Sequence, residues 1–186
     1  MDEDRLRIDD FVPAAGGEWY GLLFANPTLG LPPQLTWSFT FPFQEVPRYD
    51  DTVLSLTVEW LPMPAAADWR SVAGQHLTCA GFAEPAEASV YHSIHHRFEK
   101  VDLHLVEQRD RSLRAAATVS GDIDRLGVDP VHADAWLTFT GILVQLPDVT
   151  DPDEALTRLA DVTDTSHLTF DPTGSTAALR FTPRQD

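Results

Sequence analysis

Apolar and polar side chains alternate along much of this sequence, and a period of two places every second side chain on the same face of a β-strand. The clearest example spans 35–43, where leucine, tryptophan and phenylalanine alternate with threonine and serine. The same pattern recurs over 52–61, 101–105, 113–119 and 135–146. Shorter strands are predicted over 6–12, 19–25, 76–82, 167–170 and 177–181. Gly141 interrupts the pattern of 135–146 and predicts a bulge there.

One segment, 150–162, has the features of a helix instead. Thr150 or Asp151 can cap it, Pro152 suits the first helical position, and two acidic residues follow in the first turn. Its predicted buried stripe consists of Leu156, Leu159 and Ala160. Together, the patterns predict a mainly β (α+β) protein, either an antiparallel β-sandwich or a strongly bent sheet of about ten strands, with one C-terminal helix near 151–162.

The segment 86–99 fits two interpretations. A helix would align four potential metal ligands on one face, at spacings i, i+3, i+4 and i+7. These are His92, His95, His96 and Glu99. A strand would continue the alternation of 101–105 and separate His92 from His96 by about 13 Å. We favour the strand, because it joins its neighbours more simply, so we do not expect the helical metal site.

A second candidate site follows from the strand interpretation. A turn near Glu99 and Lys100 would bring His95 opposite Asp102 or His104. Two imidazoles and a carboxylate suit a divalent metal. The competing interpretation is a half-polar sheet face without a ligand, because a metal site needs three or four converging ligands. We therefore expect no cofactor, with a divalent metal at these three residues as the alternative.

The charge of the chain limits its partners. It has 29 acidic and 13 basic residues, which gives a formal net charge of −16. Nucleic acids and anionic membranes require a cationic surface, so we expect neither as a partner. A neutral or basic protein partner is favoured. Arg109, Arg111 and Arg114 gather at a predicted hairpin tip and are the candidate partner-binding residues, although nearby acids almost cancel their charge.

Length and composition predict one globular domain over 1–186. The chain has 186 residues, of which 43% are hydrophobic, enough for a full core. Its single cysteine, Cys79, can form no internal disulfide, and we expect it to be a buried, inert thiol. No stretch approaches the roughly 20 apolar residues of a membrane span, and the first ten residues lack the pattern of a secretion signal. We expect a soluble, cytoplasmic protein.

The sequence carries none of the common motifs of serine hydrolases, P-loop proteins or dinucleotide-binding proteins. We therefore expect a non-catalytic binding protein. Its most concrete form is an acidic, immunity-type protein that neutralises a basic partner such as a toxin enzyme. One alternative is a metal-dependent enzyme or small-ligand binder that uses the face of His95, Asp102 and His104. Another is a structural homo-oligomer that pairs through an exposed sheet face or edge.

Overall fold

In the part of the chain that the computed structural model describes, ten strands, most of them antiparallel, form one continuous sheet, with a single α-helix near the C-terminus. The structure describes residues 5–47, 49, 53–63, 68–80, 86–174 and 178–184. The strands are β1 (Gly17–Asn26), β2 (Leu31–Pro42), β3 (Ser55–Pro62), β4 (His76–Ala80), β5 (Glu87–His92), β6 (Ile94–Arg109), β7 (Ser112–Asp122), β8 (Val131–Gln145), β9 (Leu168–Asp171) and β10 (Leu179–Pro183). The helix is α1 (Pro152–Ala160), and the 3-10 turns are η1 (Ile8–Asp10), η2 (Pro27–Leu29) and η3 (Trp69–Ser71). The predicted class, mainly β with one C-terminal helix, is confirmed.

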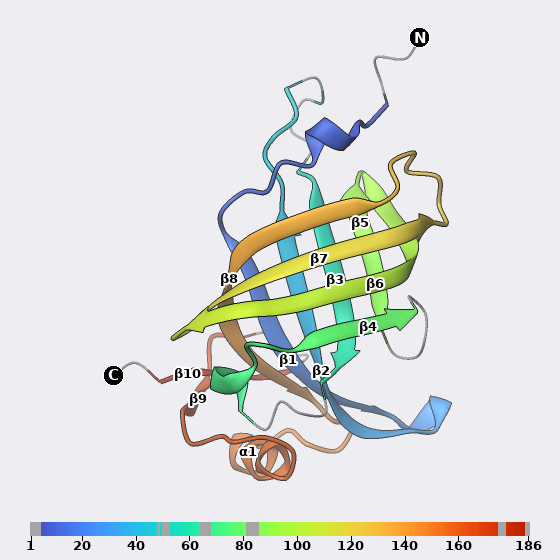
Figure 1. The fold of residues 1–186 in the computed structure, drawn as a ribbon. Coiled ribbons are helices and arrows are strands. Elements are labelled where there is room, and N and C mark those ends of the chain that lie inside the picture. Colours follow the sequence, from blue (N-terminus) through green and yellow to red (C-terminus); the bar gives the residue numbers. More distant parts are fainter. Residues whose placement is uncertain are drawn as a thin grey trace.

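The sheet closes on itself because β1 pairs along both of its edges. It runs antiparallel to β2 on one side and parallel to β8 on the other. The path continues from β2 through β3, β5, β6 and β7 back to β8. Figure 1 shows the two walls, with β8, β7, β6 and β4 in front of β1, β2, β3 and β5. Beyond this closed part, β10 and β9 extend the sheet from β8, and β4 pairs with β6.

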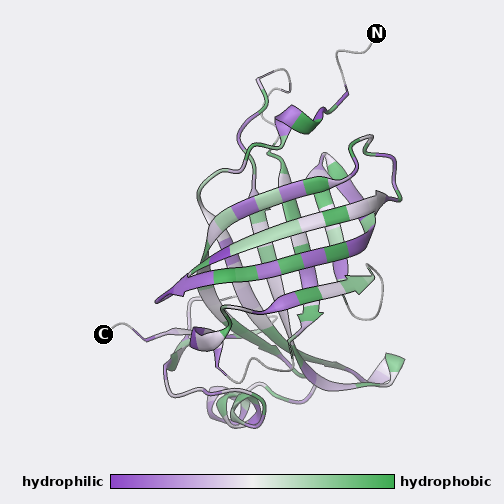
Figure 2. Cartoon of the chain, viewed as in Figure 1, coloured by the Kyte–Doolittle hydropathy of each residue, from purple (hydrophilic) through white to green (hydrophobic). Residues whose placement is uncertain are grey.

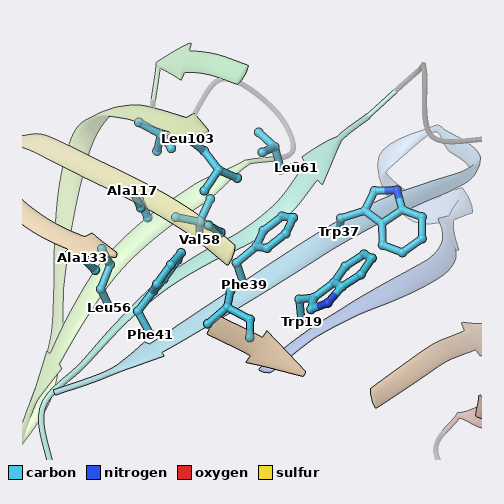
Figure 3. Close-up of a cluster of buried hydrophobic side chains, with 14 of the residues drawn as sticks. Trp19, Trp37, Phe39, Phe41, Leu56, Val58, Leu61, Leu103, Ala117 and Ala133 are labelled. Carbon is cyan, nitrogen blue, oxygen red and sulfur yellow. The ribbon is translucent and has the colours of Figure 1, made fainter. Parts of the chain in front are cut away.

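Side chains from both walls fill the inside of the closed sheet. Along β6, β7 and β8 the apolar and polar residues alternate, as the banded colours of Figure 2 show, and most of the apolar ones are buried, Ile94, Val106 and Trp136 being exposed. Trp19 lies at the centre of an aromatic cluster, with ring centroids 4.7 Å from Phe139 and 5.5 Å from Trp37. Away from the two tryptophans, Ala117 and Ala133 of the facing wall lie beside Phe41 and Leu56 in the core (Figure 3).

The bulge predicted at Gly141 is confirmed. The partners of β8 on β1 advance from Phe139 to Gly141 between Trp19 and Tyr20, so one residue of β8 is left over. Gly141 has a φ of +125°, and a Cβ at this position would lie 2.3 Å from the carbonyl oxygen of Phe181. Only glycine allows β10 to pack this closely against β8.

The predicted helix is confirmed as α1, and Asp151 is its N-cap. The Asp151 carboxylate accepts hydrogen bonds from the backbone N–H groups of Asp153 and Glu154, both at 3.0 Å. The predicted buried stripe is partly wrong. Leu159 is buried, but its buried neighbour one turn earlier is Ala155. Leu156 is only partly buried and Ala160 is exposed.

The N-terminal strand predicted over 6–12 is wrong. This segment contains η1, between the buried side chains of Leu6 and Phe11. The Asp10 carboxylate accepts a hydrogen bond from the Arg7 backbone N–H at 2.6 Å and closes the turn. Of the other predicted strands, residues 52, 81, 82 and 177 lie outside the described part of the chain.

The strand interpretation of 86–99 is confirmed for its described residues, but the turn lies elsewhere than expected. Ser93, with a left-handed φ of 62°, joins β5 to β6, and β6 continues through Glu99 and Lys100. His92 and His96 are therefore diagonal neighbours across a hairpin, with ring centroids 6.4 Å apart instead of the expected separation of about 13 Å. Burial, together with the neighbouring His96, lowers the pKa of His92.

Gly141→Ala is expected to lower the free energy of unfolding. The unfavourable φ alone costs about 1–3 kcal/mol, and the collision with the Phe181 carbonyl adds to this cost. Gly16→Ala is the matched control: its φ is +94°, but nothing lies within 4 Å of the added Cβ. Urea unfolding followed by tryptophan fluorescence measures both variants. Equal losses would contradict the close packing of β10 on β8.

Candidate functional site

Two histidines and an aspartate converge on the outer face of the sheet, where β4 lies beside β6. The odd-numbered residues of 101–105 are buried apolar side chains, so Asp102 and His104 face outward. β4 runs antiparallel to this stretch, with His76 directly opposite His104. Side chains that are directly opposite or diagonal on one face of a sheet lie within contact distance.

The three side chains share one carboxylate oxygen. Oδ1 of Asp102 lies 2.9 Å from Nε2 of His76 and 3.0 Å from Nε2 of His104. Since a carboxylate oxygen only accepts hydrogen bonds, the His76 Nε2–H donates to it, and Nε2 of His104 lies within ion-pair distance of the same oxygen. The two imidazole rings stack, with centroids 3.8 Å apart and planes inclined by 15°. The His76, His104 and Asp102 side chains are 50%, 51% and 48% exposed, so water and ions reach the cluster freely.

The structure brings together two of the three predicted metal ligands and puts His76 in the place of His95. Without a turn at Glu99 and Lys100, His95 and Asp102 lie on one extended strand, about 23 Å apart at roughly 3.3 Å per residue. His95 instead pairs with Tyr91 across the β5–β6 hairpin, and its Nδ1 lies 3.0 Å from Oγ of Ser89. The predicted set of His95, Asp102 and His104 is corrected accordingly.

Sequence reasoning missed His76, although one signal for it was present. His76 begins the predicted strand 76–82 and lies on the same face as Thr78. That alternation indicates an outward side chain, but it does not indicate which strand lies alongside. The pairing of β4 with β6 is a long-range contact, so it leaves no trace in the local pattern.

A hollow of about 540 Å³ adjoins the cluster, between β4, β6 and β7. Its polar lining residues include Asp102 itself, Lys100, Thr78, Thr118 and Ser120. Burial raises the pKa of the Cys79 thiol, which also lies here. A partly buried thiol that holds its proton is a poor nucleophile, in agreement with the expectation of an inert cysteine.

The three arginines predicted to bind a partner each have a partner within the chain. Arg109 pairs with Glu107 at 2.7 Å, and Arg114 pairs with Asp134 at 2.8 Å. Arg111 donates hydrogen bonds to backbone carbonyls at the end of β10. The contacts of Arg111 and Arg114 join the β6–β7 hairpin to β10 and β8, whereas Arg109 pairs within its own strand. A role for the arginines in partner binding stays a prediction.

A groove of about 580 Å³ lies between the α1 segment and the β1–β2 hairpin, whose end extends beyond the rest of the sheet in Figure 1. Its lining is mostly apolar and includes Leu23, Leu31, Leu146, Val149 and Val162. Four prolines also line it: Pro27, Pro32, Pro33 and Pro147. Proline fixes φ, so these walls keep their shape without a ligand. Val162, just after α1, is 41% exposed.

The α1 side of this groove is acidic. Residues 148–164 contain six acids and one base: Asp148, Asp151, Asp153, Glu154, Asp161, Asp164 and, as the base, Arg158. Asp148 and Asp161 line the groove directly. Arg158 also lines it, but its guanidinium lies 3.7 Å from the Glu154 carboxylate, which offsets its charge. The groove therefore combines apolar walls with a rim that has two carboxylates, Asp148 and Asp161, and one guanidinium, Arg158.

Two glutamates also lie opposite each other on the outer surface of β3 and β5. Glu59 and Glu87 are directly opposite in the antiparallel register. Burial raises the pKa of Glu59, the charge of Glu87 raises it further, and His95 acts in the opposite direction. Like charges at opposed positions destabilise a sheet. This pair therefore destabilises the folded protein.

No protein-family model, curated protein or solved structure matches this chain. Among the residues that the structure describes, no helix is both long enough and apolar enough to cross a membrane. A function is therefore inferred from the geometry and charge of the chain itself.

Glu59→Gln is expected to stabilise the protein at about pH 7 by about 0.2–1 kcal/mol, the range of cross-strand pairs. Folding raises the pKa of Glu59, so the penalty of the charged form is full above the raised pKa and disappears below the ordinary value of 4.5. The gain should therefore be absent at about pH 3.5. Urea midpoints at both pH values measure it, with Glu45→Gln at an exposed site as the control for net charge. An equal gain at both pH values would contradict the electrostatic cause.

Proposed function

We propose that this protein is a non-catalytic binding protein, and that it takes a basic segment of a partner protein, anchored by apolar side chains, into the groove beside α1. The observation that carries this proposal is the combination of apolar walls and acidic rim in one groove. Neither feature alone selects a partner. Together they favour a segment that presents leucine-like side chains on one face and lysine or arginine around it.

The apolar walls support binding energy at this groove. A volume of about 580 Å³ is enough for several side chains of an amphipathic segment. Burial of apolar surface is the main favourable contribution to protein association. Because prolines hold four positions of the wall, little conformational freedom is lost when a partner binds, and affinity rises as that loss falls.

The acidic rim supports the choice of a basic partner. With a net charge of −16, the whole chain attracts cations at long range, and the rim concentrates negative charge where the partner would dock. Electrostatic complementarity of this kind accelerates association and excludes acidic competitors. An immunity-type role, in which a basic enzyme is neutralised, is the particular form of this function that fits the charge best. We place it in the cytoplasm, a setting that the free thiol of Cys79 supports.

A designed peptide tests the groove. The probe is a synthetic peptide of about 15 residues with leucine at helical spacing i, i+3, i+4 and i+7 and arginine elsewhere. We expect one peptide to bind per chain in isothermal titration calorimetry, with an affinity that falls as salt concentration rises. The same peptide with glutamate in place of arginine should not bind. No binding of the arginine peptide at low salt would overturn the proposal.

Matched variants separate the groove from the overall charge. Asp148→Asn combined with Asp161→Asn removes two rim carboxylates and should weaken binding of the arginine peptide by about tenfold, whereas Glu45→Gln combined with Glu99→Gln makes the same change in net charge elsewhere. Val162→Ser should also weaken it, and Ile94→Ser, at a site 62% exposed on the β5–β6 hairpin, should not. The groove would be excluded as the site if the two double carboxylate variants weakened peptide binding equally, or if the two serine variants did. A dimer in light scattering that Val162→Ser converts to a monomer would favour self-association through this groove instead.

A further inference from the structure

We propose that His76, Asp102 and His104 bind a divalent transition metal of the zinc class on the outer face of β4 and β6. This surface lies apart from the groove residues, and the inference does not depend on the proposed function. One ligand atom from each residue lies within 4.8 Å of the other two. The set consists of two imidazole nitrogens and one carboxylate oxygen, each a donor that zinc accepts.

The spacing of the donors fits an ion of this size. Zinc binds nitrogen and oxygen at about 2.0–2.2 Å, so two ligand atoms of a tetrahedral site lie about 3.3–3.5 Å apart. Oδ1 of Asp102 is now 2.9 Å and 3.0 Å from the two Nε2 atoms. An ion therefore needs this oxygen to withdraw from the nitrogens by only a few tenths of an ångström. A metal ion binds the lone pair of Nε2, so each imidazole must be in the neutral tautomer whose single proton is on Nδ1, and the hydrogen bond from Nε2–H to Asp102 is given up when the ion binds.

Binding also requires the two imidazoles to turn. The lone pair of each Nε2 lies in the plane of its ring, so two stacked rings inclined by only 15° do not aim at one point. At least one of them must rotate out of the stack. Both side chains are about half exposed, which leaves space for this rotation. The backbone need not move, because the register of β4 on β6 already fixes His76 opposite His104.

The donor set selects the class of metal. Calcium and magnesium prefer oxygen ligands alone, whereas imidazole suits zinc, copper and nickel. Three protein ligands leave a fourth position for water, and the hollow beside Asp102 provides room for it. Thr78 and Thr118, on the strands at either side of Asp102, line the same hollow, and the Thr118 hydroxyl lies 2.9 Å from Nδ1 of His132.

Titration with metal ions tests the site. Protein without a polyhistidine tag, freed of metal by a chelator, is titrated with ZnCl₂ in a calorimeter and with CoCl₂ in a spectrophotometer. We expect one zinc ion per chain, and visible absorption bands of cobalt bound in a site with imidazole ligands. His76→Gln, His104→Gln and Asp102→Asn should each weaken zinc binding by at least about 100-fold, since loss of an outer-shell partner alone weakens it by about 10–100-fold.

His95→Gln and His167→Gln are the matched controls, because each removes one exposed imidazole outside the cluster, from the β5–β6 hairpin and from the residue before β9. They should leave the zinc affinity unchanged. Urea midpoints of the metal-free variants, expected to equal that of the original chain, show that a lost affinity is not a lost fold. Absence of stoichiometric zinc binding would overturn the proposal, as would an equal loss in His95→Gln. Binding of the arginine peptide should be unaffected in His76→Gln, so failure of one proposal leaves the other intact.

Discussion

The parallel pairing of β1 with β8 is the contact on which the rest of the structure depends. β1 already pairs with β2 along its other edge, so this second ladder converts a bent sheet into a closed one. Closure pairs backbone groups that would otherwise form two exposed strand edges. It also brings Trp19 of β1 against Phe139 of β8 and encloses the aromatic cluster. Packed apolar side chains then fill the inside of the closed sheet, so the candidate polar sites lie on its outer face and on the elements beyond the closed part.

Both candidate sites lie on such added elements. His76 belongs to β4, which pairs with β6 outside the main strand path, and the groove lies where the β1–β2 hairpin and the α1 segment extend past the closed sheet. In the first site the sheet itself sets the geometry. Neighbouring strands lie about 4.8 Å apart and alternate residues of one strand about 6.7 Å apart, so His76, Asp102 and His104 are held at contact distance by the backbone alone. In the second site, four prolines fix the backbone dihedral φ at their positions in the groove wall.

The sequence predicted what depends on neighbouring residues and missed what depends on long-range pairing. The alternation over 101–105 and 113–119 predicts inward and outward faces correctly, and the cap at Asp151 locates α1, because each is a local property. The turn at Ser93 was missed, since a serine with positive φ carries no compositional signal. The difference in the candidate cluster has the same origin: because the turn was predicted six residues too late, His95 was expected in the position that His76 occupies beside Asp102 and His104, and no local pattern indicates the partner strand of His76.

Amide hydrogen exchange tests the closure of the sheet most directly. If β1 and β8 form a continuous ladder, the amides of 21–23 in β1 and 142–144 in β8 should exchange only when the whole protein unfolds, with the same free energy as the amides of 101–105 in β6. Exchange in β1 and β8 through a local opening, at a free energy well below that of β6, would show that the sheet is open at this seam and would contradict the account.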